Sequence, residues 1–279
     1  MSKHSTHATT NATSTVQSAD GTTISYLSLG SGPAVIVIPG ALSLASDYAA
    51  FARALAENFT VYTIERRGRG LSGPQGNDYS IRKECEDVQA LQRKTGASLL
   101  VGHSFGGLVA LEVARHSNAF TSIAVYEPGV SIDGSIPAEW IPVYEKMLAE
   151  GKKMDAFIEF IKAFNPQNSG KTPSWLLKLM LPLFMGSHRL QLKLSLLQQN
   201  LREHKEVVRL DNSYANYREI SAKVLLMYGG KGPTSQGMQQ LVAVFPQSAS
   251  KVFPALGHFG INEGNPQEVA GAVSAYFKQ

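Results

Sequence analysis

The sequence predicts an α/β fold, in which a mostly parallel central sheet is flanked by helices and interrupted by an inserted helical lid. Three observations lead to this prediction. Short apolar runs alternate with longer runs of helical periodicity in the first and last parts of the chain. The alternation stops between residues 131 and 219, where only helical patterns occur. The 279 residues, of which 43% are hydrophobic and 17% charged, suffice for one such domain with a sizeable core.

The first part of the chain alternates between expected strands and helices. Residues 15–17 and 23–29 flank Asp20-Gly21, a dipeptide typical of tight turns, and they predict an opening hairpin. The continuous apolar run Ala34–Ile38 is typical of a parallel strand that is buried on both faces. After it we expect a helix over 44–58, a strand over 60–64, a helix over 80–94, a strand over 98–101, a helix over 105–116 and a strand over 122–126.

The pattern of strand and helix returns after the predicted lid. We expect strands over 223–228 and 251–253, and helices over 235–245 and 266–277. These segments divide the chain into a core of residues 18–130 and 220–279, a helical lid of residues 131–219, and a flexible tail of residues 1–17. The tail is rich in Ser, Thr, Asn and Ala and has no apolar segment typical of a signal peptide.

Charge and cysteine content exclude several classes of function. Lys and Arg exceed Asp and Glu by only 26 to 22, and the surplus is scattered, so we expect no nucleic-acid partner. No run is long enough to span a membrane, because Lys178 and Pro182 interrupt the most apolar segment. The only cysteine, Cys85, can form neither an intrachain disulfide nor a thiolate metal cluster. We therefore expect a cytoplasmic monomer or homodimer.

A G-x-S-x-G motif places Ser104 between an apolar strand and a helix rich in small residues. Gly102 and Gly106 keep the neighbouring backbone clear of a serine held on a strained strand-to-helix turn. The turn also directs the N-terminus of the helix, with its free N–H groups, toward the oxyanion of an acyl-transfer reaction. This context makes Ser104 a candidate nucleophile and not part of a flexible Gly/Ser loop.

Two further segments accompany this motif, ERRGRGLS at 65–72 and LGHF at 256–259. With them, the chain from about Val16 to its end resembles the α/β-hydrolase family, in which a D-x-R-G-x-G-x-S loop follows a strand. Glu65 stands where the family usually has Asp, a change that we expect this structural loop to tolerate. The resemblance implies that His258 is the general base for Ser104. His103 adjoins the nucleophile but is expected to point elsewhere, because successive side chains on a turn diverge.

The catalytic acid departs from the commonest pattern of the family. In many members an Asp follows the strand equivalent to residues 223–228, but residues 229–234 contain no acid. Some members carry the acid one strand earlier, and Glu127 directly follows the strand over 122–126. We therefore predict that Glu127 orients His258. Asp133 is the alternative acid, and a Glu127 that merely caps the first turn of the lid is the competing interpretation.

The oxyanion donors are expected to be backbone groups. One is the N–H of Phe105, and the resemblance implies that the other is the N–H of Ala41, although the family often has His where Pro39 stands. Three arginines, Arg66, Arg67 and Arg69, form the most conspicuous charge run and suggest an anion clamp. We expect instead that most of them are solvated or paired with Glu and Asp.

The predicted lid carries many apolar side chains at helical spacing, and most should pack the lid onto the core: Trp140, Tyr144, Met147, Phe157, Phe160, Ile161, Phe164, Trp175, Leu176, Leu177, Leu179, Met180, Leu183, Phe184 and Met185. Such a lid favours a dry pocket over Ser104 and a hydrophobic, uncharged, ester-like small-molecule substrate. No metal-ligand spacing occurs, and neither a metal nor a cofactor is implied.

We therefore expect a carboxylesterase-like serine hydrolase that acts through an acyl-enzyme. The same triad also serves lactonases, carbon–carbon bond hydrolases, perhydrolases and hydroxynitrile lyases, so these reactions stay open. The vacant Asp position at Gly232 leaves open a hydrolase-fold protein that binds a ligand without turnover.

Overall fold

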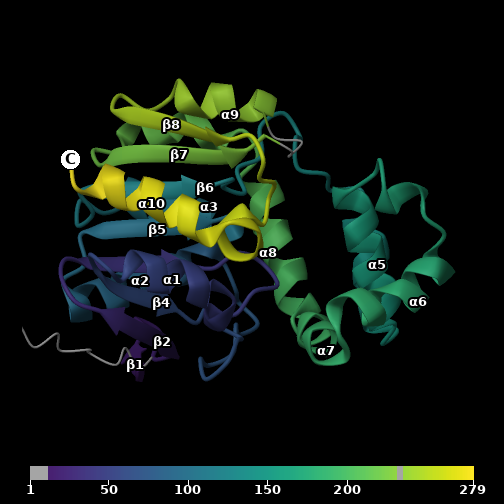
Figure 1. The fold of residues 1–279 in the computed structure, drawn as a ribbon. Helices are drawn as coiled ribbons and strands as arrows, with labels where there is room; N and C mark the ends of the chain where they lie inside the picture. Colours follow the sequence, from purple (N-terminus) through teal and green to yellow (C-terminus); the bar gives the residue numbers. More distant parts are fainter. Residues whose placement is uncertain (1–11, 231–234) are drawn as a thin grey trace, which may run out of the picture.

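The structure, a computed structural model that describes residues 12–230 and 235–279, contains one sheet of eight strands flanked by helices (Figure 1). The strands are β1 (Ala12–Gln17), β2 (Thr23–Gly30), β3 (Ala34–Ile38), β4 (Thr60–Ile64), β5 (Leu99–His103), β6 (Ser122–Tyr126), β7 (Lys223–Gly229) and β8 (Ser248–Phe253). Their order in the sheet is β1-β2-β4-β3-β5-β6-β7-β8. The pairs β1–β2 and β2–β4 are antiparallel and the others are parallel, so the predicted α/β class is confirmed.

The core lies on both faces of the sheet, and β3 shows why its sequence is apolar throughout. Val35 and Val37 pack against one helical layer, while Ile36 and Ile38 pack against the other. The first layer holds η1 (Ala45–Tyr48), α1 (Ala49–Leu55), η4 (Gly260–Gly264) and α10 (Pro266–Phe277), and the second holds α2 (Ile81–Thr95), α3 (Phe105–Arg115) and α9 (Ser235–Val242). Burial on both sides leaves no polar face, which explains the continuous apolar run.

Several boundaries differ from those expected. The prediction of a flexible tail over residues 1–17 is wrong for residues 12–17, because they form β1. This strand pairs with β2 in a register that runs from Ala12–Ser28 to Gln17–Thr23. Residues 1–11 lie outside the described part of the chain. Strand β8 begins at Ser248, before the expected start, because this edge strand is exposed there and has no apolar signal. The helix expected over 44–58 is the 3₁₀ turn η1 followed by α1, which ends at Leu55.

Between β6 and β7 the chain forms a helical insertion. Its helices are α4 (Ile141–Ala149), α5 (Lys153–Phe164), η2 (Ser169–Lys171), α6 (Ser174–Met185), α7 (Ser187–Ser195), α8 (Leu197–Arg209) and η3 (Ser213–Glu219). Figure 1 shows α8 beside the sheet, with α5, α6 and α7 extending away from the core. The insertion has its own buried cluster, built around Trp140, Tyr144, Phe157 and Leu197.

The apolar side chains of the insertion do not all pack as expected. One face of α6 is exposed to solvent: Trp175 is 69% exposed, Leu179 61%, and Leu183 and Phe184 77% each. The expectation that such residues pack the insertion onto the core is therefore wrong for these four residues, whereas Leu177 of the same helix is buried. Among the described residues, no helix combines the length and the apolar character needed to cross a membrane.

Candidate active site

Three side chains that are far apart in the sequence meet beyond the carboxyl ends of the parallel strands. Ser104 follows β5, Glu127 follows β6, and His258 lies in the loop after β8. The Nε2 atom of His258 lies 3.1 Å from Oγ of Ser104, and its Nδ1 atom lies 2.8 Å from Oε2 of Glu127. The side chain of His258 is 40% exposed and that of Glu127 only 1%. The arrangement gives a hydroxyl, an imidazole and a buried carboxylate in one hydrogen-bonded row, as acyl transfer requires.

The turn at Ser104 is strained in the manner expected of a nucleophile elbow. Ser104 has φ 53° and ψ −124°, a conformation that residues with a side chain rarely adopt. Helix α3 begins at the next residue, and its N-terminus therefore faces the serine. A Cβ atom on Gly106 would collide with the carbonyl oxygens of Ile38 and Pro39, so only glycine fits two residues after the serine.

Glu127 is held at two points by the neighbouring strand β7. Its backbone N–H donates to the carbonyl of Met227 over 2.8 Å, and its Oε1 accepts from the N–H of Gly229 over 2.9 Å. Its φ of 41° turns the side chain off the end of β6. Asp133 is exposed, and the imidazole of His258 contacts Glu127 and not Asp133. The geometry therefore supports Glu127 over both alternatives, the acid at 133 and a capping role.

The residues expected to supply the oxyanion donors belong to two segments next to Ser104, the start of α3 and the loop after β3. Within the described residues, neither the N–H of Ala41 nor that of Phe105 donates a hydrogen bond to another group of the chain. The preceding residue, Gly40, approaches the serine closely, because a Cβ atom on it would lie 3.1 Å from Cβ of Ser104. Two unengaged N–H groups beside the nucleophile are what stabilisation of a tetrahedral oxyanion requires.

The helical insertion contacts the loop that contains Ala41. Leu42, which has φ 53°, packs into the buried cluster of the insertion. Its carbonyl accepts a 2.6 Å hydrogen bond from Nζ of Lys193 on α7. Burial lowers the pKa of Lys193 below its usual value, and Asp47, 3.5 Å away, acts in the opposite direction. The insertion is thus attached next to the candidate oxyanion donor.

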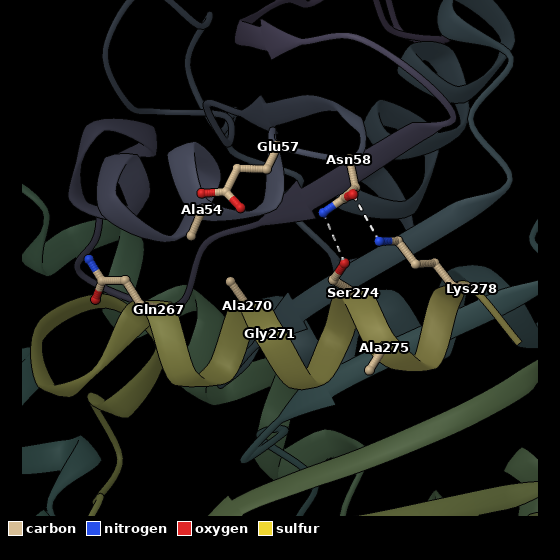
Figure 2. Close-up of a pocket in the computed structure, with 9 residues that line it drawn as sticks. All are labelled: Ala54, Glu57, Asn58, Gln267, Ala270, Gly271, Ser274, Ala275 and Lys278. Atoms are coloured by element: carbon tan, nitrogen blue, oxygen red, sulfur yellow. Dashed lines mark hydrogen bonds between the residues drawn. The ribbon is translucent and has the colours of Figure 1, made fainter.

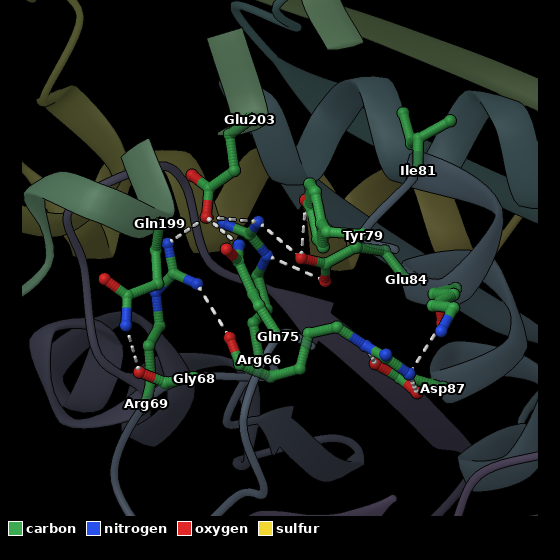
Figure 3. Close-up of polar contacts among 12 residues, drawn as sticks. Arg66, Gly68, Arg69, Gln75, Tyr79, Ile81, Glu84, Asp87, Gln199 and Glu203 are labelled. Atoms are coloured by element: carbon green, nitrogen blue, oxygen red, sulfur yellow. Dashed lines mark hydrogen bonds and ion pairs between the residues drawn. The ribbon is translucent and has the colours of Figure 1, made fainter. Parts of the chain in front are cut away.

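The arginine run forms a buried ion-pair cluster and not an anion clamp (Figure 3). Arg66 pairs with Glu84 at 2.8 Å and with Glu203 of α8 at 3.0 Å, and Arg69 pairs with Glu203 at 2.5 Å. Burial alone would raise the pKa of Glu84, but the charge of Arg66 outweighs it and holds this pKa below its usual value. The expected pairing with acids is therefore observed, whereas the expected solvation is not.

This ion-pair cluster also touches the candidate active site. Nη1 of Arg66 donates to the carbonyl of Gly40 over 3.2 Å, and its guanidinium lies 4.6 Å from the ring centroid of Phe105. Arg67 instead pairs with Asp87 at 2.7 Å, away from these contacts. Arg66 thus joins the two oxyanion segments to Glu203 of the insertion.

Two surface hollows lie elsewhere on the molecule. One, of about 510 Å³, lies between α1 and α10 and is lined by small and polar side chains (Figure 2). The other, of about 440 Å³, lies between the segment 74–77 and α8. Neither is lined by Ser104, Glu127 or His258, so the dry pocket expected over Ser104 stays a prediction.

Two residues beside the site were not predicted to matter, Tyr48 and His103. The imidazole of His103 contacts the hydroxyl of Tyr48 and the backbone carbonyl of His258. Position 103 lies inside the G-x-S-x-G motif, so the sequence could have marked His103 as a neighbour of the nucleophile. No pattern in the sequence connects it to position 48. Within the described residues, no cluster of three or more His, Cys, Asp or Glu could hold a metal ion.

Comparisons with known proteins agree with this architecture. The sequence model of the protein family described as "Alpha/beta hydrolase family" matches residues 35–272 of this chain. A 2-(acetamidomethylene)succinate hydrolase of Mesorhizobium japonicum is 22% identical over 266 residues, 91% of each chain. An N-formylmaleamate deformylase of Pseudomonas putida is 33% identical over 123 residues, 42% of this chain and 46% of the deformylase. The crystal structure of an alpha/beta hydrolase from Sphaerobacter thermophilus has a TM-score of 0.79 and 28% identity, and the match covers 95% of this chain and 100% of that one.

Proposed function

Because the chain belongs to the alpha/beta hydrolase family, we propose that it is a serine hydrolase that cleaves carboxylic esters of hydrophobic, uncharged substrates through an acyl-enzyme. One observation carries the proposal: Oγ of Ser104 lies 3.1 Å from Nε2 of His258, whose Nδ1 lies 2.8 Å from Glu127. A serine hydroxyl is a weak nucleophile at its ordinary pKa, and a neighbouring imidazole held by a carboxylate is the usual means of activating it.

The first half of the reaction transfers the acyl group to the protein. Oγ of Ser104 bonds to the ester carbonyl carbon while Nε2 of His258 takes the hydroxyl proton. The carbonyl electron pair moves onto oxygen, and the N–H groups of Ala41 and Phe105 stabilise this oxyanion. The C–O bond then breaks as His258 returns the proton to the departing alkoxide, which leaves as the alcohol. Glu127 holds the imidazole in the tautomer that these transfers need and stabilises its charged form.

The second half repeats the same steps with water. His258 takes a proton from water as the hydroxyl oxygen attacks the acyl-enzyme, and the same two N–H groups hold the second oxyanion. Return of the proton to Oγ of Ser104 releases the carboxylic acid. A side chain of His258 that is 40% exposed gives water access to this step.

Apolar surface near the site supports a hydrophobic substrate. Phe259, next to the proposed base, is 54% exposed, and on the insertion, farther from the core, α6 has a second exposed apolar face that contains Trp175 and Leu179. Exposed apolar groups of this size often mark surfaces that bind another molecule. We propose that the insertion acts as a lid that excludes water from Ser104 when substrate is bound.

Cleavage of an amide C–N bond is the second candidate. It is supported by two of the curated relatives: one is a deformylase of N-formylmaleamate, and the other hydrolyses 2-(acetamidomethylene)succinate, a substrate that contains an acetamido group. The same residues serve both reactions, because only the leaving atom that receives the proton differs.

The compartment and the assembly are also proposals. We propose a cytoplasmic protein that is a monomer or a homodimer. The only cysteine, Cys85, is a buried free thiol in α2, which is compatible with a reducing compartment.

The test combines active-site labelling with a substrate panel. We expect a fluorophosphonate to label the wild-type protein at Ser104 and not the Ser104→Ala variant. We expect turnover of neutral p-nitrophenyl esters of graded acyl length to exceed turnover of matched formamides and of esters bearing a carboxylate. Faster turnover of the formamides would instead establish the amide candidate. Tight binding of panel members with neither labelling nor turnover would show a binding protein.

A further inference from the structure

A continuous chain of hydrogen bonds joins the loop of Gly40 to the loop of His258, both of which lie next to Ser104. The backbone N–H of Gly40 lies 2.9 Å from the hydroxyl of Tyr48, and this hydroxyl lies 2.5 Å from Nδ1 of His103. On the other side of the ring, Nε2 of His103 lies 2.8 Å from the carbonyl oxygen of His258. The chain thus begins next to Ala41 and ends on the main chain of the proposed base.

The chemistry of the groups fixes the direction of every bond. A carbonyl oxygen only accepts, so Nε2 of His103 carries the proton and donates a hydrogen bond to the carbonyl of His258. In a neutral imidazole the other nitrogen, Nδ1, is then an acceptor, and it takes the proton of the Tyr48 hydroxyl. The oxygen of Tyr48 in turn accepts from the N–H of Gly40. Each of the three bonds joins one donor to one acceptor, so no two donors face each other.

Burial keeps His103 and Tyr48 in the protonation states that this chain requires. His103 is 2% exposed and Tyr48 is fully buried. Burial, together with the charge of the neighbouring His258, lowers the pKa of His103 well below its usual value, so the ring stays neutral. Burial likewise raises the pKa of the Tyr48 hydroxyl above its usual range. The rings that face His103 are those of Tyr48, Tyr126 and His258, with centroids 5.8, 5.8 and 4.9 Å away.

We propose that Tyr48 and His103 are positioning residues, which hold the loop of Gly40 and Ala41 and the loop of His258 at fixed places around Ser104. This proposal rests on the function proposed above, because it assigns no new reaction. Catalysis depends on both loops at once, since one supplies an oxyanion donor and the other the base. Displacement of a reacting group by about 1 Å is enough to slow an enzyme by orders of magnitude.

Tyr126 supports the same loop beside the chain of hydrogen bonds. Its hydroxyl donates to the carbonyl of Gly257 over 2.8 Å, and His103 donates to the carbonyl of His258. Two consecutive carbonyls of the loop that contains the base are therefore held by buried side chains. A Cβ atom on Gly260 would collide with that hydroxyl, which shows how closely the loop follows these side chains. The base is therefore located through its main chain as well as through the contact of its ring with Glu127.

The variants separate the two halves of the chain. Tyr48→Phe removes the hydroxyl and keeps the ring. His103→Gln places an amide near the position of Nε2 and keeps a donor for His258, whereas His103→Asn places its amide near Nδ1 and keeps an acceptor for Tyr48. Tyr144→Phe is the matched control: Tyr144 is also fully buried, and its hydroxyl also makes two hydrogen bonds, to Leu197 and from Asn200, inside the insertion.

The main readout is the second-order rate of fluorophosphonate labelling at Ser104, measured with the midpoint of thermal unfolding. We expect Tyr48→Phe and both variants of His103 to label about 10- to 100-fold more slowly. With an ester that is turned over, kcat should fall by a similar factor while KM stays within about twofold. Tyr144→Phe should lose a comparable amount of thermal stability and keep the wild-type rate.

A combined variant tests whether the groups act as one unit. Tyr48→Phe added to His103→Gln, which has already lost the acceptor at Nδ1, should slow labelling by clearly less than the product of the two single effects. Spectra of ¹⁵N-labelled histidine should show His103 protonated at Nε2 only, without change between pH 8 and pH 5.5.

Three results would overturn the proposal. The first is a labelling rate of Tyr48→Phe equal to that of the wild type, and the second is a loss of labelling rate in Tyr144→Phe as large as that in Tyr48→Phe. The third is a proton on Nδ1 of His103. A wild-type protein that labels but cleaves no ester contradicts the proposed substrate class alone, because the labelling rates of the variants still decide the role of Tyr48 and His103. Failure of the wild-type serine to label overturns both proposals.

Discussion

The backbone N–H of Gly229, at the end of β7, donates a 2.9 Å hydrogen bond to Oε1 of Glu127, at the end of β6. The other carboxylate oxygen, Oε2, faces the imidazole of His258. Strand β7, which bears the acid in many members of the family, here contributes a donor that orients an acid from the neighbouring strand. The carboxylate cannot rotate without losing one of these two bonds, so its acceptor remains directed at the imidazole.

We expect Glu127→Gln to lower kcat about 10³- to 10⁴-fold with little change in fold, because the side chain keeps its size. If the amide oxygen keeps the bond to Gly229, its NH₂ group faces Nδ1 of His258 and favours the wrong tautomer. Steady-state kinetics on an active ester measures the effect. Asp133→Asn is the control and should keep full activity; a large loss there, with Glu127→Gln unaffected, would move the acid to position 133.

Glu65 should make stability fall as pH rises. Burial raises the pKa of Glu65 to about 7, whereas the carboxyl of the unfolded chain ionises near 4.5. Between these two values the unfolded state releases a proton that the folded state retains, so stability is lost through this window as pH increases. Glu65→Gln removes this loss, and its stability relative to wild type should rise by roughly 3 kcal/mol between pH 4.5 and pH 7.5. Urea unfolding across this range measures it, and a constant difference would contradict it.

Glu203 is the shared partner of two buried arginines, and its removal should be costly. We expect Glu203→Ala to destabilise the fold by about 3–5 kcal/mol, because Arg69 loses its carboxylate partner and Arg66 loses one of two. Chemical denaturation followed by circular dichroism gives the value. For comparison, Glu145→Ala breaks the exposed pair with Lys205 and should cost less than about 1 kcal/mol. Equal effects of the two variants would show that the buried cluster contributes no more than a surface pair.

Gly106 and Gly271 provide a matched pair of substitutions. A Cβ atom at Gly106 meets backbone carbonyls that cannot move aside, so Gly106→Ala should displace the serine turn and abolish labelling of Ser104. At Gly271, in the middle of α10, an added Cβ meets nothing within 4 Å. Gly271→Ala should therefore leave activity unchanged and stabilise the helix by up to about 1 kcal/mol. Comparable labelling of the two variants would refute the steric argument.

Much of the framework could be predicted from sequence because its signals are local. The run Ala34–Ile38 showed a strand buried on both faces, and the glycines around Ser104 showed a strained turn between a strand and a helix. Parallel strands place their carboxyl ends at one edge, so Ser104 and Glu127 had to be neighbours once the strand order was known. The position of Glu127 at the end of a strand was therefore informative although the more common acid was missing.

Other features could not be predicted, because they depend on contacts between distant segments. Tyr48 and His103 are 55 positions apart, and they meet only because the end of η1 lies against the end of β5 in the folded protein. Nothing in the sequence indicated that the arginines are buried, because the acids that pair with them lie elsewhere in the chain. Glu84 belongs to α2, and Glu203 belongs to α8 of the insertion. The exposure of α6 also escaped prediction, since helical spacing of apolar residues does not state which surface, if any, covers them.

The helical insertion divides the proposed machinery along the polypeptide. Nucleophile and acid precede it, the base follows it, and β6 and β7 pair in parallel register across the division, from Ser122–Lys223 to Tyr126–Met227. A protease that cut the insertion would break the covalent connection between the part with Ser104 and Glu127 and the part with His258. Noncovalent contacts, this strand pairing among them, would still hold the two parts together. Two separately expressed fragments, cut within the insertion, would then be inert alone and would regain turnover only on assembly, which makes this fold a template for a split reporter.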